Sequence, residues 1–176
     1  MNKVKNIAEM HRFSEAEFEA TAKLPLVAVL DQVRSQHNVG AVFRSADAFA
    51  IEAVYLCGIC PGPENTEVHK TALGAEKTVH SEHFDNTCDA IRSLHERGYR
   101  VYAVEIAENS LHLEDIPLPP GLAVVFGHEV FGVSQDVVDM CDGCIEIPQY
   151  GTKHSLNVSV TAGIVLYELS TRMRSC

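Results

Sequence analysis

The stretch that decides the fold is CIEIPQYGTKHSLNVSV, residues 144–160. It begins as a short β-branched strand that ends at Pro148, because proline has no N–H group to continue a ladder. Gly151 permits a turn, and Ser155 is predicted to cap a long apolar helix that runs to Arg172. Free N–H groups at a helix start favour an anion. The polar residues at this junction are therefore either an ordinary helix cap or part of a ligand site.

The composition predicts one compact domain. The chain has 176 residues, of which 46% are hydrophobic, and this is enough apolar material for a core. No apolar run is long enough to span a membrane, and the start is polar, so we expect a soluble, cytoplasmic protein without a signal peptide. The net charge of −10 argues against broad attraction to nucleic acid but leaves room for a local basic patch.

Two C-x-x-C pairs, Cys57/Cys60 and Cys141/Cys144, have the spacing of a zinc half-site. Both pairs lie at the ends of predicted strands, where small buried thiols are common. The pairs are also far apart in the sequence, unlike those of compact zinc modules. We therefore favour free thiols in a reducing compartment over a structural zinc.

Strands and helices alternate along the rest of the chain. Continuous apolar runs predict buried strands, and apolar positions at helical spacing predict helices, one of which begins after a cap at Asn38. The predicted strands are residues 26–30, 53–57, 100–104 and 122–126, and the predicted helical segments are 39–49, 70–73 and 89–98. This order is typical of an α/β fold with a mostly parallel sheet flanked by helices.

Ser14 and Glu17 form the pattern of a capping box at the start of an acidic helix over residues 13–22. We expect residues 1–24 to be a helical arm and residues 25–176 to be a single domain.

Polar clusters follow three of the predicted strands, at the edge where open α/β sheets bind ligands. They are HNVG with Arg44 and Ser45, GHEVFG at residues 127–132, and the stretch that ends in Ser155 and Asn157. Each cluster has a plain structural explanation, such as Asn38 as a helix cap or Glu129 as a surface acid. A G-x-G-x-x-G fingerprint and a P-loop are both missing from the sequence, so a Rossmann dinucleotide site and a P-loop nucleotide site are unsupported.

Three segments together resemble the motifs of the SpoU (TrmH-type) RNA ribose 2′-O-methyltransferases, members of the SPOUT superfamily. They are HNVGAVFRSADAF (37–49), VVFGHEVFGVS (124–134) and IEIPQYGTKHSLNVSVTAGIVLYE (145–168). The resemblance extends from Leu26 to Glu168. It implies a SPOUT-type sheet with a C-terminal deep trefoil knot, S-adenosylmethionine as the cofactor, and methyl transfer to a ribose 2′-hydroxyl of RNA without a metal.

The resemblance also implies roles for individual residues. Arg44 matches the catalytic arginine, and the other matched polar positions are Asn38, Glu129, Ser155 and Asn157. Main-chain groups at Gly127, Ile147 and Leu156 would hold the cofactor. Gln149 departs from the methionine found in many members, which should alter only the lining of the cofactor loop.

The RNA and the partner remain expectations. Exposed cations near the cleft, namely Arg34, Lys70, Lys153 and His154, would contact RNA in the absence of an added RNA-binding module. The IPQ-x-G wording favours tRNA, at a guanosine in the D-loop, over rRNA. Family members pair through the C-terminal helix, so we expect a homodimer. The alternatives are a catalytically idle RNA-binding domain on the same fold and a cofactor enzyme of other small-molecule chemistry.

Overall fold

The computed structural model of the protein describes residues 2–4, 6 and 13–175. Seven strands form one sheet in the order β3-β2-β1-β6-β4-β7-β5, and each recorded strand pair is parallel. In chain order the elements are α1 (Glu15–Ala20), β1 (Leu24–Asp31), α2 (Gln36–Ala48), β2 (Ile51–Cys57), α3 (Thr66–Ala72), α4 (Ala75–Thr78), β3 (His80–Phe84), α5 (Thr87–Glu96), β4 (Arg100–Val104), β5 (Leu111–His112), η2 (Leu113–Asp115), β6 (Leu122–Phe126), α6 (Gln135–Met140), β7 (Gly143–Glu146) and α7 (Val158–Ser175). The predicted α/β class is confirmed.

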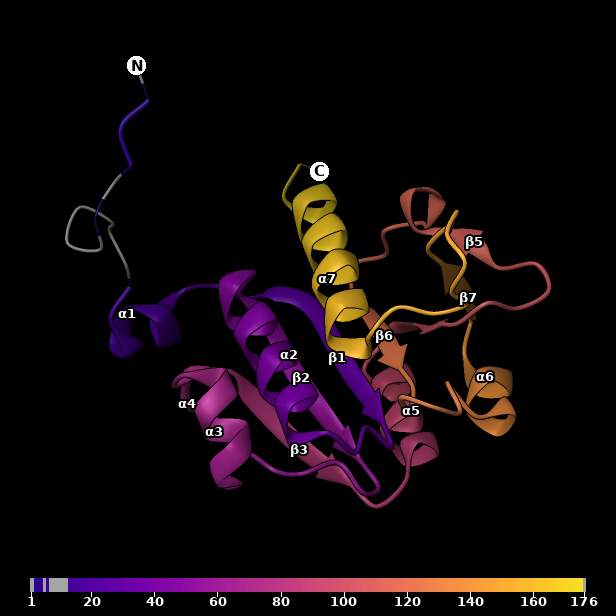
Figure 1. Ribbon diagram of the computed structural model, residues 1–176, viewed down its shortest axis with the longest axis horizontal. Coiled ribbons are helices and arrows are strands. Elements are labelled where there is room, and N and C mark those ends of the chain that lie inside the picture. The colour runs from indigo at the N-terminus through magenta and orange to yellow at the C-terminus, as the bar shows by residue number, and fades with distance from the viewer. Residues whose placement is uncertain (1, 5, 7–12, 176) are drawn as a thin grey trace.

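Helices cover both faces of the sheet (Figure 1). One core joins alternate strand residues such as Leu26 and Leu30 to the apolar sides of α2, α3 and α7. The other core joins the alternate set, such as Val27 and Val29, to α5 and α6. Strands buried on both faces need apolar residues at every position, which explains the continuous runs in the sequence.

Strand β1 is central, because it pairs with β2 on one side and with β6 on the other. Its residues Leu26 to Leu30 have no exposed surface. The strand order therefore reverses around β1, and such a switch point is where open α/β sheets bind ligands.

Helices α2 and α3 cross closely at Gly40. A Cβ atom at this position would lie 2.6 Å from the Val68 carbonyl oxygen and 2.8 Å from the Thr71 Cβ atom. Only glycine permits this approach, which places α3 beside the first turn of α2.

Two predicted helix starts are wrong. Ser35, not Asn38, is the N-cap of α2, and its side chain accepts a hydrogen bond from the Asn38 N–H. Helix α7 begins at Val158, and the Asn157 Oδ1 atom caps it by accepting from the N–H groups of Ser159 (2.9 Å) and Val160 (3.4 Å). Ser155 lies before this cap in the loop.

The capping box of α1 is confirmed, with reciprocal hydrogen bonds between Ser14 and Glu17. Residues 1, 5 and 7–12 of the predicted arm lie outside the described residues. Among the helices that the structure describes, none is both long and apolar enough to cross a membrane.

Candidate active site

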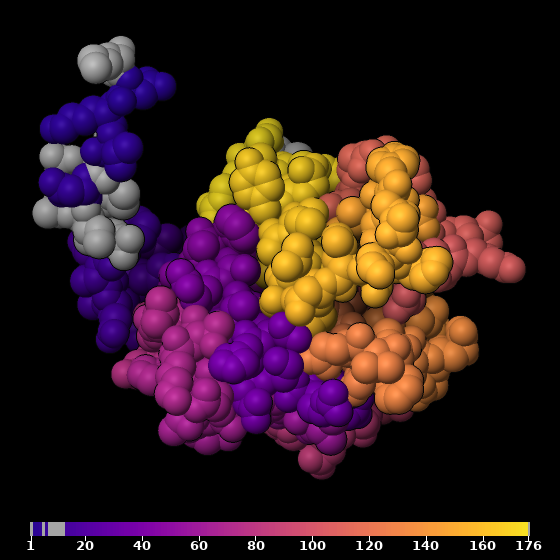
Figure 2. All heavy atoms as spheres, viewed as in Figure 1, coloured from indigo at the N-terminus to yellow at the C-terminus, as the bar shows by residue number. Residues whose placement is uncertain are grey.

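The site lies where β1, β4, β6 and β7 end, because the carboxyl ends of parallel strands meet at one edge. The segments that follow these strands begin at Gln32, Glu105, Gly127 and Ile147. Helix α2 runs beside α7 on this side of the sheet, so chain segments far apart in sequence meet there (Figure 2).

Glu129 attaches the loop after β6 to the start of α2. Its Oε1 atom accepts hydrogen bonds from the Ser35 N–H (2.9 Å) and the Asn38 Nδ2 atom (3.0 Å). Its Oε2 atom accepts a third from the Arg34 N–H (3.2 Å). The carboxylate thus binds free N–H groups before and at a helix start, where a negative charge is favoured.

These hydrogen bonds set the ionisation of Glu129. Partial burial acts to raise the pKa of its carboxyl group, but the bonds from Ser35, Asn38 and Arg34 outweigh burial. The pKa is therefore held below its ordinary value of 4.5, and the group is a carboxylate at neutral pH.

Asn38 links the first and third motifs. Its Nδ2 atom donates to Glu129, while its Oδ1 atom accepts from the Asn157 Nδ2 atom (3.2 Å). The Asn157 Oδ1 atom caps α7. One line of side chains thus joins residues 129, 38 and 157, and the start of α2 is fixed relative to the start of α7.

A cavity of about 350 Å³ opens next to this line. A smaller one of about 90 Å³ shares the walls Glu105, Ile106, Ser155, Leu156 and Thr161 with it. Gly127 lines the larger cavity, Ile147 the smaller one, and Leu156 both. The three positions assigned to the cofactor by resemblance therefore line two adjoining cavities.

Glycine is required at residue 127 because the backbone of residues 132–133, later in the same loop, packs directly against it. A Cβ atom there would lie 2.2 Å from the Gly132 carbonyl carbon and 2.3 Å from the Val133 nitrogen. A larger residue would push residues 132–133 away and alter the cavity wall.

The remaining predicted residues are exposed. The Arg44 side chain is exposed on α2, lines neither cavity, and makes no hydrogen bond or ion pair with any other residue that the structure describes. Ser155 lines both cavities and likewise makes no hydrogen bond within residues 13–175. Their polar groups are available to a ligand.

The four cations predicted to bind RNA, Arg34, Lys70, Lys153 and His154, are all exposed. The structure places His154 on the wall of the smaller cavity and Arg34 next to the Glu129 anchor. Lys70 is held by Glu67 on its own helix, with its Nζ atom 2.6 Å from the carboxylate, so it is a less available cation than the sequence suggests.

Two residues of this region are missing from the sequence prediction. Ser35 caps α2 and contacts Glu129 through its N–H. Glu105 lines both cavities, and its Oε2 atom accepts from the Val133 N–H (3.1 Å). Glu105 directly follows β4, so the strand-end rule that selected the other clusters could also have selected it.

The cysteines are part of the packing. Cys60 Sγ donates to the Leu30 carbonyl oxygen (3.2 Å) and accepts from the Val33 N–H (3.1 Å). Burial raises the pKa of Cys57 to about 12 and that of Cys60 to about 11. All five cysteines in the described part are free, and no group of three or more His, Cys, Asp or Glu side chains there could hold a metal.

Fold and site together define an α/β protein of the parallel-sheet class, with a ligand cavity at the switch point beside a polar line of side chains. A sequence profile of the SpoU rRNA Methylase family matches residues 25–167. The chain belongs to this family.

Individual relatives agree with this assignment. The tRNA (guanosine(18)-2′-O)-methyltransferase of Thermus thermophilus is 33% identical over 143 residues, covering 81% of this chain and 73% of the relative. The 23S rRNA (guanosine-2′-O-)-methyltransferase RlmB of Vibrio cholerae is 35% identical over 167 residues, covering 94% of this chain and 67% of the relative. The AdoMet-bound rRNA methyltransferase of Sinorhizobium meliloti superposes with a TM-score of 0.80 at 25% identity, covering 88% of this chain and 60% of that one.

Proposed function

We propose that the protein is an S-adenosylmethionine-dependent RNA ribose 2′-O-methyltransferase. The observation that supports this most directly is the placement of the cavity. The larger cavity is lined by Gly127 and Leu156 and lies next to the polar line from Glu129 through Asn38 to Asn157, and the adjoining smaller cavity is lined by Ile147 and Leu156. The profile match and the guanosine 2′-O-methyltransferases among the relatives support the same activity.

The cavity suits the cofactor in size and chemistry. Its walls combine apolar side chains, such as Leu156 and Val158, with main-chain groups of the loops after β6 and β7. The lining of the larger cavity is more polar than apolar, which suits a charged ligand such as S-adenosylmethionine better than a purely apolar one. Gly127, Ile147 and Leu156 would hold the cofactor, which supplies an electrophilic methyl group.

The chain's own residues act on the acceptor. A ribose hydroxyl is a weak nucleophile, so it needs a proton acceptor or a group that stabilises the developing oxyanion. The guanidinium group is a fixed positive charge in proteins, and that of the exposed Arg44 lowers the pKa of the hydroxyl and orients the adjacent phosphate. Ser155 orients the ribose, whereas Asn157, whose side chain is hydrogen-bonded to Asn38 and to the start of α7, holds the loops together with Glu129 and Asn38. Positioning of this kind supplies much of the rate.

The substrate is a structured RNA, with a guanosine in the tRNA D-loop as the first candidate. The second candidate is rRNA. It is supported by the relative named for 23S rRNA, which matches a larger share of this chain than the tRNA relative does. An overall acidic protein with few cations at the site should bind RNA with modest affinity, because few phosphate contacts can form.

Radiolabelled S-adenosylmethionine and separate pools of unmodified tRNA and rRNA test the proposal. We expect label in tRNA and none with Arg44→Ala. Label in rRNA alone would change the assigned substrate from tRNA to rRNA and leave the assigned reaction unchanged. Label in neither pool would contradict the enzymatic activity, and the idle RNA-binding domain would then be the better description.

We also propose an organisation for the molecule. The methyltransferase domain covers residues 25–176, and the profile match that begins at residue 25 supports a division from the segment before it. The last third of the chain forms the deep trefoil knot that family membership suggests. Two copies pair through α7, whose exposed Val160, Ile164 and Tyr167 support this contact. The protein acts in the cytoplasm, where its RNA substrates are.

A further inference from the structure

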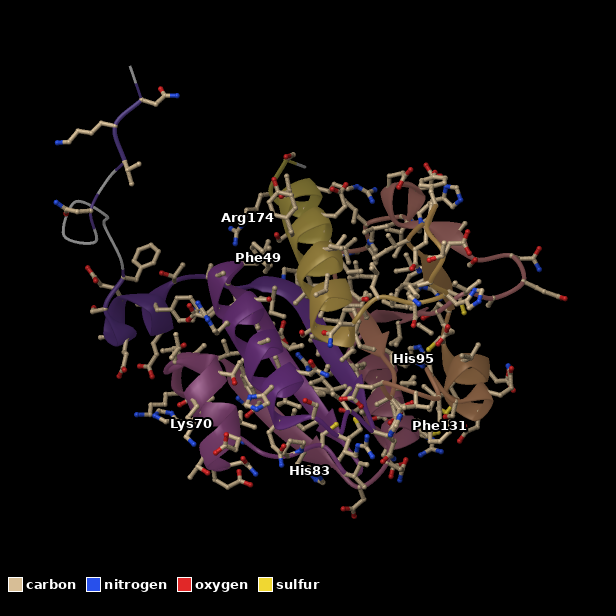
Figure 3. All side chains as sticks on the ribbon, viewed as in Figure 1. Phe49, Lys70, His83, His95, Phe131 and Arg174 are labelled. Carbon is tan, nitrogen blue, oxygen red and sulfur yellow. The ribbon has the colours of Figure 1, made fainter. Side chains whose placement is uncertain are left out.

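The loop between β6 and α6 exposes two neighbouring apolar side chains. Val130 is 70% exposed and Phe131 is 82% exposed. Phe131 is labelled in Figure 3. Such exposure of adjacent large side chains is unfavourable in water unless a ligand or partner covers them.

The loop that carries these two exposed side chains is fixed by hydrogen bonds. His128 and Gly132 exchange two backbone hydrogen bonds of 3.0 and 2.9 Å, and the His128 Nδ1 atom accepts from the Val130 N–H (3.0 Å). Glu129, between them, is anchored on α2. The loop thus presents its tip in a fixed conformation, which lowers the entropy cost of binding.

The Phe131 ring is supported by a second ring. Its centroid lies 4.9 Å from that of His128, with 33° between the ring planes. The two rings form a tilted pair on the rim of the larger cavity, which both residues line together with Gly127 and Leu156, and the exposed Phe131 ring is available to a ligand.

We propose that Phe131, backed by His128, is a platform on which a base of the RNA substrate stacks. The inference rests on the proposed function, because a ribose that reaches the cavity brings its own base or its neighbour's to this rim. RNA enzymes and binding proteins read unpaired bases by stacking them on aromatic side chains. Stacking also needs no positive charge, which suits a chain of net charge −10 whose Lys70 is already paired.

A second copy of the chain is the competing occupant of Phe131. The exposed apolar residues of α7, namely Val160, Ile164 and Tyr167, form a separate stripe and do not line the cavity at which Phe131 lies. A dimer through α7 therefore leaves Phe131 without an assigned partner, whereas the reaction requires RNA at the cavity that Phe131 lines.

The absence of tryptophan from the chain allows a direct test. In Phe131→Trp the new indole is the only one, and stacking of a base quenches its fluorescence. The probes are an RNA stem-loop with an unpaired guanosine in the loop and the same stem-loop with an abasic site there. Phe13→Trp, which changes another exposed phenylalanine (57%) at the start of α1, is the control.

We expect the guanosine stem-loop to quench Phe131→Trp, the abasic stem-loop to quench it much less, and neither to quench Phe13→Trp. Equal quenching by both RNAs, or none, would overturn the platform. This readout needs no turnover, so it separates failure of the platform from failure of the methyltransferase assignment.

Kinetics provide the second arm of the test. For Phe131→Ala we expect the KM for RNA to rise about tenfold, in line with the loss of one stacked base. Phe131→Leu keeps much of the apolar volume but lacks the ring, so its KM for RNA should rise nearly as much. Phe131→Tyr keeps the ring and should bind RNA as the wild type does. Cofactor affinity and molar mass should stay unchanged in all three variants. A change in either one would assign Phe131 to the cofactor loop or to a protein interface and overturn the proposal.

Discussion

Arg44 differs from the other polar residues of the site because no described residue binds its guanidinium. Glu129, Asn38 and Asn157 are held by one another, so their polar groups serve the framework. Arg44 lines neither cavity, but it lies on α2, the helix that Glu129 and Asn38 hold in place, and a free cation there is suited to the acceptor side of the reaction.

We therefore expect Arg44→Ala to lower methyl transfer by about 100-fold or more, as removal of one oxyanion-stabilising group does, with cofactor affinity retained. Turnover with labelled cofactor and calorimetric titration of S-adenosylmethionine measure the two effects. Joint loss of binding and activity would contradict the assigned role.

Glu129 gives a pH-dependent contribution to stability. Its folded-state pKa is lowered, so the hydrogen-bonded carboxylate stabilises the fold above pH 4.5, and this stabilisation is lost as pH falls through the lowered pKa. Glu129→Gln should lower the free energy of unfolding by about 1 kcal/mol at pH 7, a value that allows for partial exposure of the carboxylate. Urea unfolding of both proteins at pH 7 and pH 4 measures it. We expect the difference to narrow at the lower pH, and a constant difference would refute the linkage.

Among the elements, the α2–α3 crossing depends on a single missing side chain. Gly40→Ala places a methyl group against the Val68 carbonyl and the Thr71 side chain, so overpacking should destabilise the fold by about 1–3 kcal/mol. Gly163→Ala on α7 is the matched control, since its Cβ atom would have only an ordinary contact at 3.8 Å with the Ser45 Oγ atom. Thermal unfolding compares the two variants, and an equal loss in both would show that the crossing is not the cause.

The elements also show how far the sequence could predict the fold. Doubly buried strands such as β1 and β6 are continuous apolar runs, so their positions were predictable. The sequence HSEHF of β3 has no such run, because this strand lies at the sheet edge with mostly exposed or half-buried side chains. Strand β5 has two residues and depends on pairing with β7. Local patterns do not identify strands that are defined by their neighbours.

The same limit applies to the candidate site. Ser35 and Asn38 are both good cap residues, and the choice depends on Glu129, which lies 91 residues beyond Asn38. The Asn38 side chain binds this distant carboxylate and Asn157 instead of capping α2, and Ser35 is the N-cap. The motif positions around the cavity were predictable by resemblance, whereas the bonds among them depend on tertiary structure.

At the scale of the whole molecule, the proposed dimer predicts a dependence of activity on assembly. Val160, Ile164 and Tyr167 are 51%, 40% and 58% exposed on α7. Ile164→Glu would bury a charge at the contact, so we expect monomers and a strong loss of activity, because we propose that pairing through α7 brings Arg44 near the cofactor of the partner subunit. Light scattering and turnover at micromolar concentration measure both. Ile59→Glu, at an isoleucine 59% exposed elsewhere, is the control. A fully active wild-type monomer would refute the arrangement.

The central place of β1 has a consequence during protein synthesis. Its neighbour β2 follows after one helix, but its other neighbour is β6, and residues 32–121 separate the two strands. While a ribosome makes residues 58–121, one edge of β1 keeps its N–H and C=O groups unpaired beside apolar side chains. Such an edge can pair with other chains. A pause in translation within residues 58–121 would therefore lengthen the time for which the nascent chain needs a chaperone.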